Sequence, residues 1–307
     1  MDPYYTHTGP RPDLASLAVN PPEGYIGSMI TPTLFVSDKT GTIYYHTVAA
    51  DVSGQTGRSS LAAPTGTAIT NTSTTWSCAE VISRGQIAPD EAKSMGGIAN
   101  ADKVGATFAI RNCMNAIETA IATATIGSTS DATFDAAKFL GQSQTALDTV
   151  RRYSGKTTLF GSTLALKRLV QAILSDSTNG KFLSRLVSGT SPNVAREGLN
   201  LKAWLDGLAM WIGVDQVLAG DDAIWNAGTN ENRVVIGKLD DGSDLLRHKY
   251  DAVYGRNIVY LPDGGSPWFV ESIADRLTKS NNYDASAWYN VKELNAAAIY
   301  VFSGIPT

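Results

Sequence analysis

The chain has 307 residues, 43% of them hydrophobic and 18% charged, which is enough for one large or two moderate domains with their own cores. A formal charge of −4 and the lack of a basic run argue against a protein that binds nucleic acid by neutralising phosphates, so we predict no sequence-specific nucleic-acid binding. The start of the chain lacks the pattern of a signal peptide, and no stretch reaches the roughly 20 apolar residues of a membrane span. We therefore expect a soluble protein without membrane contact.

The first 38 residues are rich in proline and predict an extended arm. The prolines include Pro10, Pro12, Pro21, Pro22 and Pro32. Proline donates no backbone hydrogen bond and has a fixed φ, so this density disfavours both a helix and a central strand. The arm is expected to lie over a surface.

Two segments with strand character follow, residues 42–48 and 74–82, and both are rich in β-branched and aromatic side chains. We interpret them as the two sides of a long hairpin. The residues between them, 49–73, are mostly Gly, Ser, Thr and Ala. A structureless loop of this length argues against a compact domain unless it has a role outside that domain. We therefore expect the loop to contact a neighbouring copy of the chain.

A long helix is predicted over residues 100–126. Pro89, Asp90 and Glu91 resemble an earlier helix start, because proline is tolerated in the first turn and carboxylates are favoured at the positive end of the helix dipole. Within the long helix apolar side chains recur at the helical period, and Gly127 follows the last of them. At 1.5 Å per residue the helix is roughly 40 Å long, enough to span a whole subunit.

The rest of the chain alternates between helical and strand-like segments. Amphipathic helices are predicted over residues 142–153, 164–174 and 201–211, the second capped by Ser162 or Thr163. Short strands are predicted at residues 159–160, 214–218, 233–237, 257–261, 268–271 and 297–302. This order lacks the regular βαβ repetition of a doubly wound sheet, so the predicted class is α+β.

No group of residues predicts catalysis, a cofactor or a metal site. The three histidines, His7, His46 and His248, are too far apart in the sequence for a histidine-pair metal motif. Residues 154–157 read Ser-Gly-Lys-Thr and end like a phosphate-binding loop, but the glycine required five positions before the Gly-Lys pair is Val150. We therefore predict that the chain is not an enzyme, and we assign no catalytic, cofactor-binding or metal-binding residue.

Two smaller features have structural explanations. The acidic turn at residues 240–244 lacks the ligand spacing of a calcium loop and is interpreted as solvated, with a cation at a contact between subunits as the alternative. Cys78 and Cys113 lie in different predicted elements without a metal-binding spacing. We expect both to be buried free thiols, because free cysteine behaves as a small apolar side chain.

Five residues are candidates for contacts between copies of the chain: Arg58, Trp76, Glu80, Arg84 and Asp90. Trp76 lies on the outward half of the predicted hairpin, where little of its own domain can cover it, so we favour its burial against another copy. For the other tryptophans we expect ordinary core packing. The four charged residues are candidates for ion pairs between copies, with solvated surface charge as the alternative.

The order of elements resembles that of the major capsid proteins of tailed bacteriophages with the Hong Kong 97-type fold. The first segment that carries the resemblance is Tyr25-Ile26-Gly27-Ser28-Met29-Ile30-Thr31-Pro32, followed by Val36 and by residues 39–45. It looks like the family's passage from arm to hairpin. Two further segments are residues 213–220 with Trp225 and Asn226, and residues 296–302. In element order the resemblance covers the whole chain.

The resemblance implies an α+β fold of the Hong Kong 97-like capsid type, divided into five parts. These are an N-terminal arm (1–38), an extended β-hairpin loop (39–88), a peripheral domain with a spine helix (89–145), an axial domain (146–262) and a C-terminal part of the peripheral domain (263–307).

The resemblance also implies a structural protein of the virion, assembled in the host bacterial cytoplasm, that forms an icosahedral shell around double-stranded DNA. The expected partners are copies of the same chain in hexamers and pentamers, with a scaffolding, portal or decoration protein as further candidates. Three alternatives remain open: the encapsulin-type shell of a cellular nanocompartment, a cytoplasmic α/β enzyme, and another virion component such as a tail protein.

Overall fold

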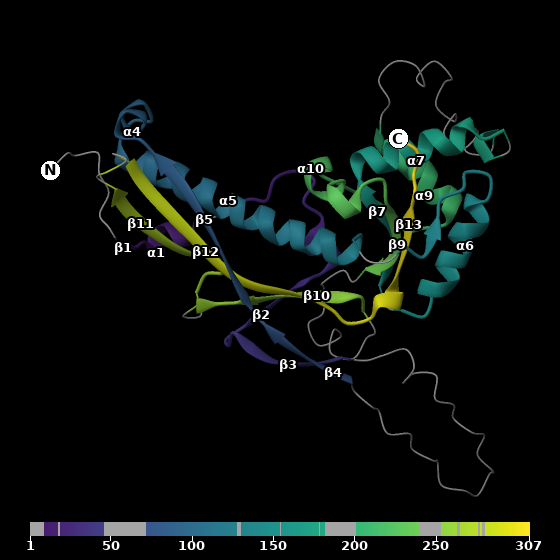
Figure 1. The fold of residues 1–307 in the computed structure, drawn as a ribbon, viewed down its shortest axis with the longest axis horizontal. Helices are drawn as coiled ribbons and strands as arrows, with labels where there is room; N and C mark the ends of the chain where they lie inside the picture. Colours follow the sequence, from purple (N-terminus) through teal and green to yellow (C-terminus); the bar gives the residue numbers. More distant parts are fainter. Residues whose placement is uncertain are drawn as a thin grey trace, which may run out of the picture.

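In the described residues the computed structural model has two large sheets joined by one long helix and a separate two-stranded hairpin, and its class is α+β, as predicted. It describes residues 9–17, 19–45, 72–127, 130–153, 155–177, 179–181, 201–239, 253–262, 265–275, 277 and 280–307. In Figure 1 the six-stranded sheet and the long helix form one end of an elongated body, and the five-stranded sheet with its helices forms the other.

The six-stranded sheet is organised by one long strand. Its strands are β1 (Gly9–Pro10), β11 (Phe269–Asp275), β12 (Ser280–Glu293), β10 (Gly255–Tyr260), β2 (Thr33–Val36) and β5 (Ala79–Ile87). One edge of β12 pairs antiparallel with β11 over its first half and with β10 over its second half. Its other edge pairs antiparallel with β5. Strand β12 was not predicted, and it is the strand on which this sheet is built.

The predicted long helix is confirmed as α5 (Ile98–Thr125), preceded by the short α4 (Pro89–Ser94). Gly97 separates the two helices with a φ of 116°, a conformation that favours glycine. The helix α5 lies very close to the sheet, because Gly85 of β5 and Gly105 of α5 have no side chains and their backbones come into contact. A Cβ atom on Gly85 would lie 2.2 Å from the carbonyl oxygen of Gly105.

The five-stranded sheet carries three helices. Its strands, in spatial order, are β6 (Ala132–Thr133), β13 (Ile299–Ser303), β9 (Val234–Leu239), β7 (Lys156–Ser162) and β8 (Gln216–Gly220). The helices are α6 (Phe139–Val150), α7 (Thr163–Ser175) and α9 (Leu201–Ile212). The predicted cap is Ser162, whose Oγ accepts a hydrogen bond from the Ala165 N–H at 2.9 Å. Phe139 packs between Trp211 and Phe302 in the core of this unit.

Sheet membership differs from the predicted division of the chain at two strands. Strand β10, residues 255–260, was placed with the middle of the chain but pairs with β12 and β2 in the six-stranded sheet. Strand β13, residues 299–303, was placed with the long helix but pairs with β9 and β6 in the five-stranded sheet. The chain therefore crosses between the units more often than contiguous boundaries allow, because strand pairing is set by contacts distant in sequence.

The described part of the N-terminal arm, residues 9–17 and 19–38, contains short regular elements, although its proline density was expected to disfavour helix. They are α1 (Pro12–Ala15) and α2 (Gly27–Ile30), in addition to β1 and β2. Pro12 occupies the first turn of α1, where its missing N–H costs nothing. Further short helices in the described part of the chain are α10 (Asp222–Trp225), η1 (Gly228–Asn230) and η4 (Ala296–Ala298).

The predicted hairpin is a separate two-stranded sheet of β3 (Thr40–Tyr45) and β4 (Thr72–Ser77), paired antiparallel. Residues 79–82 form a strand as predicted, but their placement in the hairpin was wrong, because the chain leaves the hairpin at Cys78 and continues as β5 against β12. Cys78 marks the change: its N–H donates to the Lys39 carbonyl at 2.8 Å, and its side chain is buried. The hairpin therefore projects from the six-stranded sheet (Figure 1).

Both cysteines are buried free thiols, as predicted. The Cys113 thiol donates to the Ala285 carbonyl at 3.2 Å, which fixes α5 to β12. Burial raises the pKa of Cys113 to about 11, so at neutral pH the thiol is protonated and unreactive.

Candidate functional site

The arm, the long helix α5 and the short helix α10 meet at Glu118 of α5. Its Oε1 accepts three hydrogen bonds: from the backbone N–H of Ile26 at 2.8 Å, that of Gly27 at 2.9 Å, and the indole N–H of Trp225 at 2.9 Å. Glu118 is only 5% exposed. One carboxylate thus fixes the arm and α10 to the middle of α5.

The local sequence fits this junction closely. A Cβ atom on Gly27 would lie 2.5 Å from Oε2 of Glu118, so only glycine allows the arm to approach this near. Burial raises the pKa of Glu118, while the bonds from Gly27, Trp225 and Ile26 act in the opposite direction. A carboxylate this deep in the fold is stable only because its hydrogen bonds replace water.

Apolar contacts reinforce the same junction. Ile26 and Ile30 of the arm belong to one buried cluster with Ile121 of α5 and Trp225 of α10. The Trp225 ring meets Phe160 of β7 edge to face, with ring centroids 6.4 Å apart. The arm therefore joins the two sheets, and its attachment does not depend on the carboxylate alone.

The hairpin offers two different faces to its surroundings. One face carries Gly41, Ile43, Tyr45 and Trp76, all half-buried. The other face is exposed throughout and carries Thr and Ser side chains with Tyr44, which is 62% exposed. A two-stranded ribbon is marginally stable alone in water, so a ribbon of this kind gains stability when a further surface covers it.

The four predicted contact residues that the structure describes lie on the hairpin, on β5 and on α4. Trp76 lies across the hairpin from Gly41, on which a Cβ atom would lie 2.4 Å from the indole ring. Glu80 is exposed on β5 opposite Trp288 of β12. The Asp90 side chain is 98% exposed and lies 3.8 Å from Lys93.

Arg84 pairs within its own chain. Its guanidinium donates two hydrogen bonds of 2.6 Å to the Asp284 carboxylate across the β5 and β12 pair. Arg58 lies outside the described residues. Contacts of these five residues with another copy remain a prediction, and for Arg84 such a contact would have to accommodate Asp284 as well.

Lys39 anchors the base of the hairpin to the six-stranded sheet. Its ammonium group lies 4.3 Å from the Trp288 ring centroid and 5.5 Å from that of Tyr260. Contacts of this kind are worth about 0.5–1 kcal/mol at exposed sites. The base of the hairpin is therefore fixed, while its far end extends away from the sheet.

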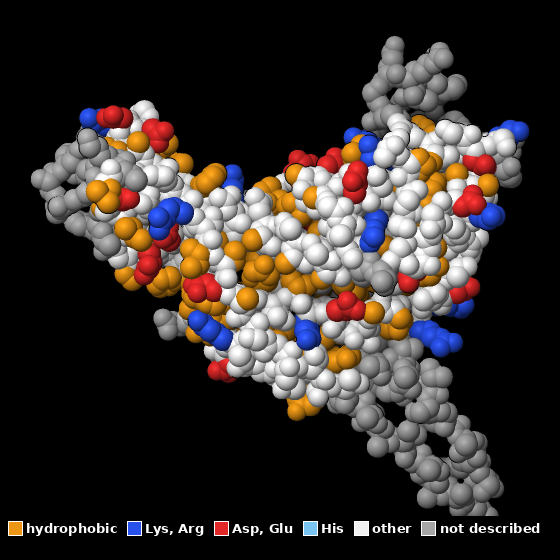
Figure 2. All heavy atoms as spheres, viewed as in Figure 1, with side chains coloured by type: hydrophobic (Ala, Val, Ile, Leu, Met, Phe, Trp, Pro, Cys, Tyr) orange, Lys and Arg blue, Asp and Glu red, His pale blue; other side chains and the backbone are white. Residues whose placement is uncertain are grey.

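Large hydrophobic side chains are exposed on several elements: Met29, Phe35, Tyr44, Ile82, Val104, Phe108, Leu140, Met210 and Leu277. Figure 2 shows hydrophobic side chains gathered across the middle of one face, below α5 and above the hairpin. Apolar surface that persists over several elements marks a site of contact with another macromolecule.

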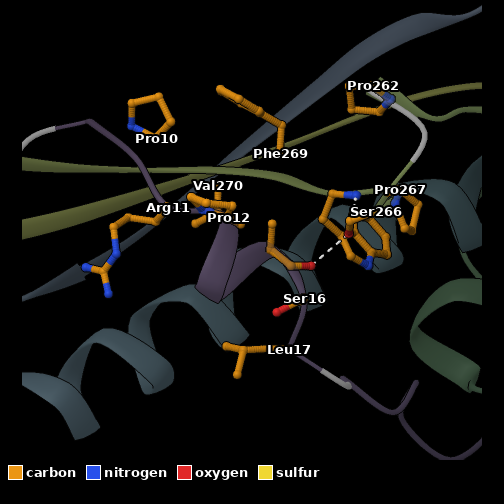
Figure 3. Close-up of a pocket in the computed structure, with 13 residues that line it drawn as sticks. Pro10, Arg11, Pro12, Ser16, Leu17, Pro262, Ser266, Pro267, Phe269 and Val270 are labelled. Atoms are coloured by element: carbon orange, nitrogen blue, oxygen red, sulfur yellow. Dashed lines mark hydrogen bonds between the residues drawn. The ribbon is translucent and has the colours of Figure 1, made fainter.

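A groove of about 740 Å³ lies between the start of the arm and the loop before β11. Prolines and aromatic side chains line it, among them Pro10, Pro12, Pro267, Trp268 and Phe269 (Figure 3). The Ser266 hydroxyl donates to the Ala15 carbonyl at 2.7 Å and accepts the Trp268 N–H at 3.2 Å, which holds the two sides together. The groove is a second surface suited to apolar contact.

The described residues hold no group of three or more His, Cys, Asp or Glu side chains placed to bind a metal ion. In the same part of the chain, no helix has the length and apolar character needed to cross a membrane. The three histidines, Ser154 of the loop-like tetrapeptide and the acidic turn at 240–244 lie outside the described residues.

Comparison with solved structures identifies the fold. A phage-related protein from Bordetella bronchiseptica superposes with a TM-score of 0.68 at 17% identity, over 98% of this chain and 99% of that chain. The mature capsid of bacteriophage PhiM1 gives a TM-score of 0.50 at 12% identity, over 94% and 88% of the two chains. An encapsulin complex from Synechococcus elongatus gives 0.51 at 8% identity, over 93% and 88%. No protein-family model and no curated protein sequence matches the chain.

The chain thus has the α+β fold of Hong Kong 97-type capsid proteins, over nearly its whole length. Sequence reasoning found the hairpin and the helix of this fold but missed Glu118 as the residue that fixes the arm. The available signal was a single carboxylate inside an otherwise uncharged half of a helix. Its partners lie 91 to 107 residues away, so the signal did not reveal them.

Proposed function

We propose that the chain is the major shell subunit of a tailed bacteriophage and assembles with copies of itself into an icosahedral capsid around double-stranded DNA. The observation that carries this proposal is the match of 98% of the chain to a phage-related protein at a TM-score of 0.68, joined by the PhiM1 capsid. In this function the protein is a structural component of the virion, put together in the host cytoplasm, and catalyses no reaction.

The proposal assigns a role to each unit of the fold. The six-stranded sheet with α5 is the peripheral domain and α5 its spine helix, while the five-stranded sheet with α6, α7 and α9 is the axial domain around the centre of each hexamer or pentamer. The hairpin of β3 and β4 is the extended loop that reaches a neighbour. Its half-buried face and the exposed apolar side chains support this assignment, because the described residues leave both incompletely covered.

Strength in such a shell comes from the number of contacts. A specific interface buries about 1,600 Å² in total. A subunit with an arm, a hairpin and two lobes makes several interfaces at once, and linked contacts multiply affinity without any single strong one. Copies of the same chain are therefore the principal partners, and a scaffolding, portal or decoration protein is an additional one.

Size-exclusion chromatography with negative-stain electron microscopy of the purified full-length chain tests this function. We expect closed shells, or rings of five and six subunits, at micromolar concentration. A compact monomer that stays monomeric at tens of milligrams per millilitre would refute the shell function.

The encapsulin complex has the same fold, and its TM-score of 0.51 is close to the 0.50 of the PhiM1 capsid. A nanocompartment shell is therefore the second candidate. The contents of particles purified from the native source separate the two: a nuclease-protected double-stranded genome indicates a capsid, and a co-purifying protein cargo without nucleic acid indicates a nanocompartment.

A further inference from the structure

A small pocket lies beside Glu118, bounded by the arm, α5 and the six-stranded sheet. Its volume is about 210 Å³. Its walls are mainly apolar and aromatic and include Tyr25, Phe35, Met114, Ile117, Val259 and Trp268. A ligand of this pocket therefore needs an apolar body.

The described lining of this pocket carries a negative charge and no positive one. Among the described residues that line it, Glu118 is the only Asp, Glu, Lys, Arg or His. Its Oε1 is occupied by three N–H donors, whereas Oε2 receives no hydrogen bond from the described residues. A buried carboxylate is costly without a cation nearby, so a cation entering the pocket is favoured.

A second acceptor without a donor lines the same pocket. Asn257 of β10 is 5% exposed, and its Oδ1 is buried without a hydrogen-bond partner among the described residues. Buried polar atoms are nearly always paired, and the exceptions call for an explanation. The carboxylate oxygen of Glu118 and the amide oxygen of Asn257 both accept hydrogen bonds, so a ligand group that only donates hydrogen bonds suits them.

We propose that this pocket binds a short primary aliphatic amine, with the ammonium group donating to Oε2 of Glu118 and Oδ1 of Asn257. The carbon chain packs against Met114 and Ile117. An ammonium has three donors on one atom and can serve two acceptors at once, whereas a guanidinium spreads five donors over a plane and needs more acceptors.

Isothermal titration calorimetry of the purified chain in phosphate buffer at pH 7.5 tests the proposal, with n-butylamine as the probe and n-butanol as its uncharged analogue. We expect saturable binding of n-butylamine at one site per chain, and an affinity for n-butanol at least tenfold lower. Equal affinities for the two compounds, or no binding of the amine, would overturn the proposal.

Variants locate the site. Glu118→Gln keeps an acceptor for the arm but removes the charge, and Asn257→Leu removes the second acceptor while leaving Glu118 in place. We expect each to weaken n-butylamine binding at least tenfold, and the matched control Asp148→Asn, an exposed carboxylate on α6 that does not line the pocket, to bind as the wild type does. Unchanged binding by Asn257→Leu and Glu118→Gln would place the amine elsewhere.

The same ammonium group also occurs on lysine side chains of a second copy. Titration of assembled particles alongside the dissociated chain separates the two sources. We expect n-butylamine to bind both forms. Binding by the dissociated chain alone would mean that a lysine of a neighbouring copy fills the pocket on assembly, and the small-molecule site would be refuted. Neither outcome bears on whether shells form.

Discussion

Glu118 makes stability depend on pH in an unusual direction. Burial is the largest influence on this carboxyl and raises its pKa above the unfolded value of about 4.5. The folded chain therefore holds the proton more tightly than the unfolded chain does. The stabilising contribution is complete below pH 4.5 and is lost as the pH rises through the folded pKa.

We expect Glu118→Gln to remove this dependence. In urea unfolding at pH 5 to 8, the stability advantage of the wild type over the variant should shrink as the pH rises, by about 1.4 kcal/mol for each unit of pKa elevation. Tyr25 interacts electrostatically with Glu118 and also with Arg111 and Asp221, and both proteins retain these three groups. An advantage that grows with pH would contradict the assigned direction of the pKa shift.

The contact between α5 and the sheet explains why a glycine lies inside a long helix. A Cβ atom on Gly105 would lie 2.2 Å from Cδ2 of Tyr283, a ring that is fully buried. The ring has no freedom to turn away, because the Tyr283 hydroxyl donates to Oδ1 of Asp102 at 2.6 Å. Arg11 of the arm pairs with the same carboxylate at 2.9 Å. Helix, sheet and arm are thus packed around one glycine.

Gly105→Ala is expected to destabilise the chain by about 1–2 kcal/mol, although alanine is the better helix former by about 1 kcal/mol. Gly141→Ala in α6 is the matched control, because nothing lies within 4 Å of the added Cβ there. That variant should be equally or more stable than the wild type. Urea unfolding measures both, and a gain in stability for Gly105→Ala would show that α5 packs less closely than described.

The elements that were predicted correctly are those whose pattern lies within their own stretch of sequence. The period of apolar side chains located α5, and β-branched and aromatic runs located the hairpin strands. Strand β12 was missed because Asn281, Asn282 and Asn290 have low strand propensity. Asn281 and Asn282 are buried, at 0% and 3% exposure, because β5 and β11 pair with them on either side. Non-local pairing of this kind leaves no period in the sequence.

The same limit applies to the candidate site. A lone glutamate in an apolar helix was visible in the sequence, but Ile26, Gly27 and Trp225 approach it only through the tertiary fold. The pocket beside it likewise combines the arm, α5 and β10. The sequence therefore predicted neighbouring residues only where they belong to the same hairpin or the same helix.

At the scale of the whole molecule, the described chain leaves one face of the hairpin half-covered, and a shell function requires other copies to complete it. Stability and assembly are then linked, because anything that binds only the folded chain raises its stability by mass action. The apparent unfolding temperature of the wild type should rise with protein concentration across the range in which shells form. Each kcal/mol gained corresponds to about 2 °C for a chain of this size.

Ile43→Glu tests this link, because it places a charge on the half-buried hairpin face. We expect the variant to remain monomeric by size-exclusion chromatography, since burying an unpaired carboxylate in a contact is costly. Its unfolding temperature in differential scanning calorimetry should match that of dilute wild type within about 2 °C and stay constant with concentration. Gln144→Glu adds the same charge on the exposed side of α6 and should assemble normally. Shells formed by Ile43→Glu would mean that this face of the hairpin makes no contact between copies.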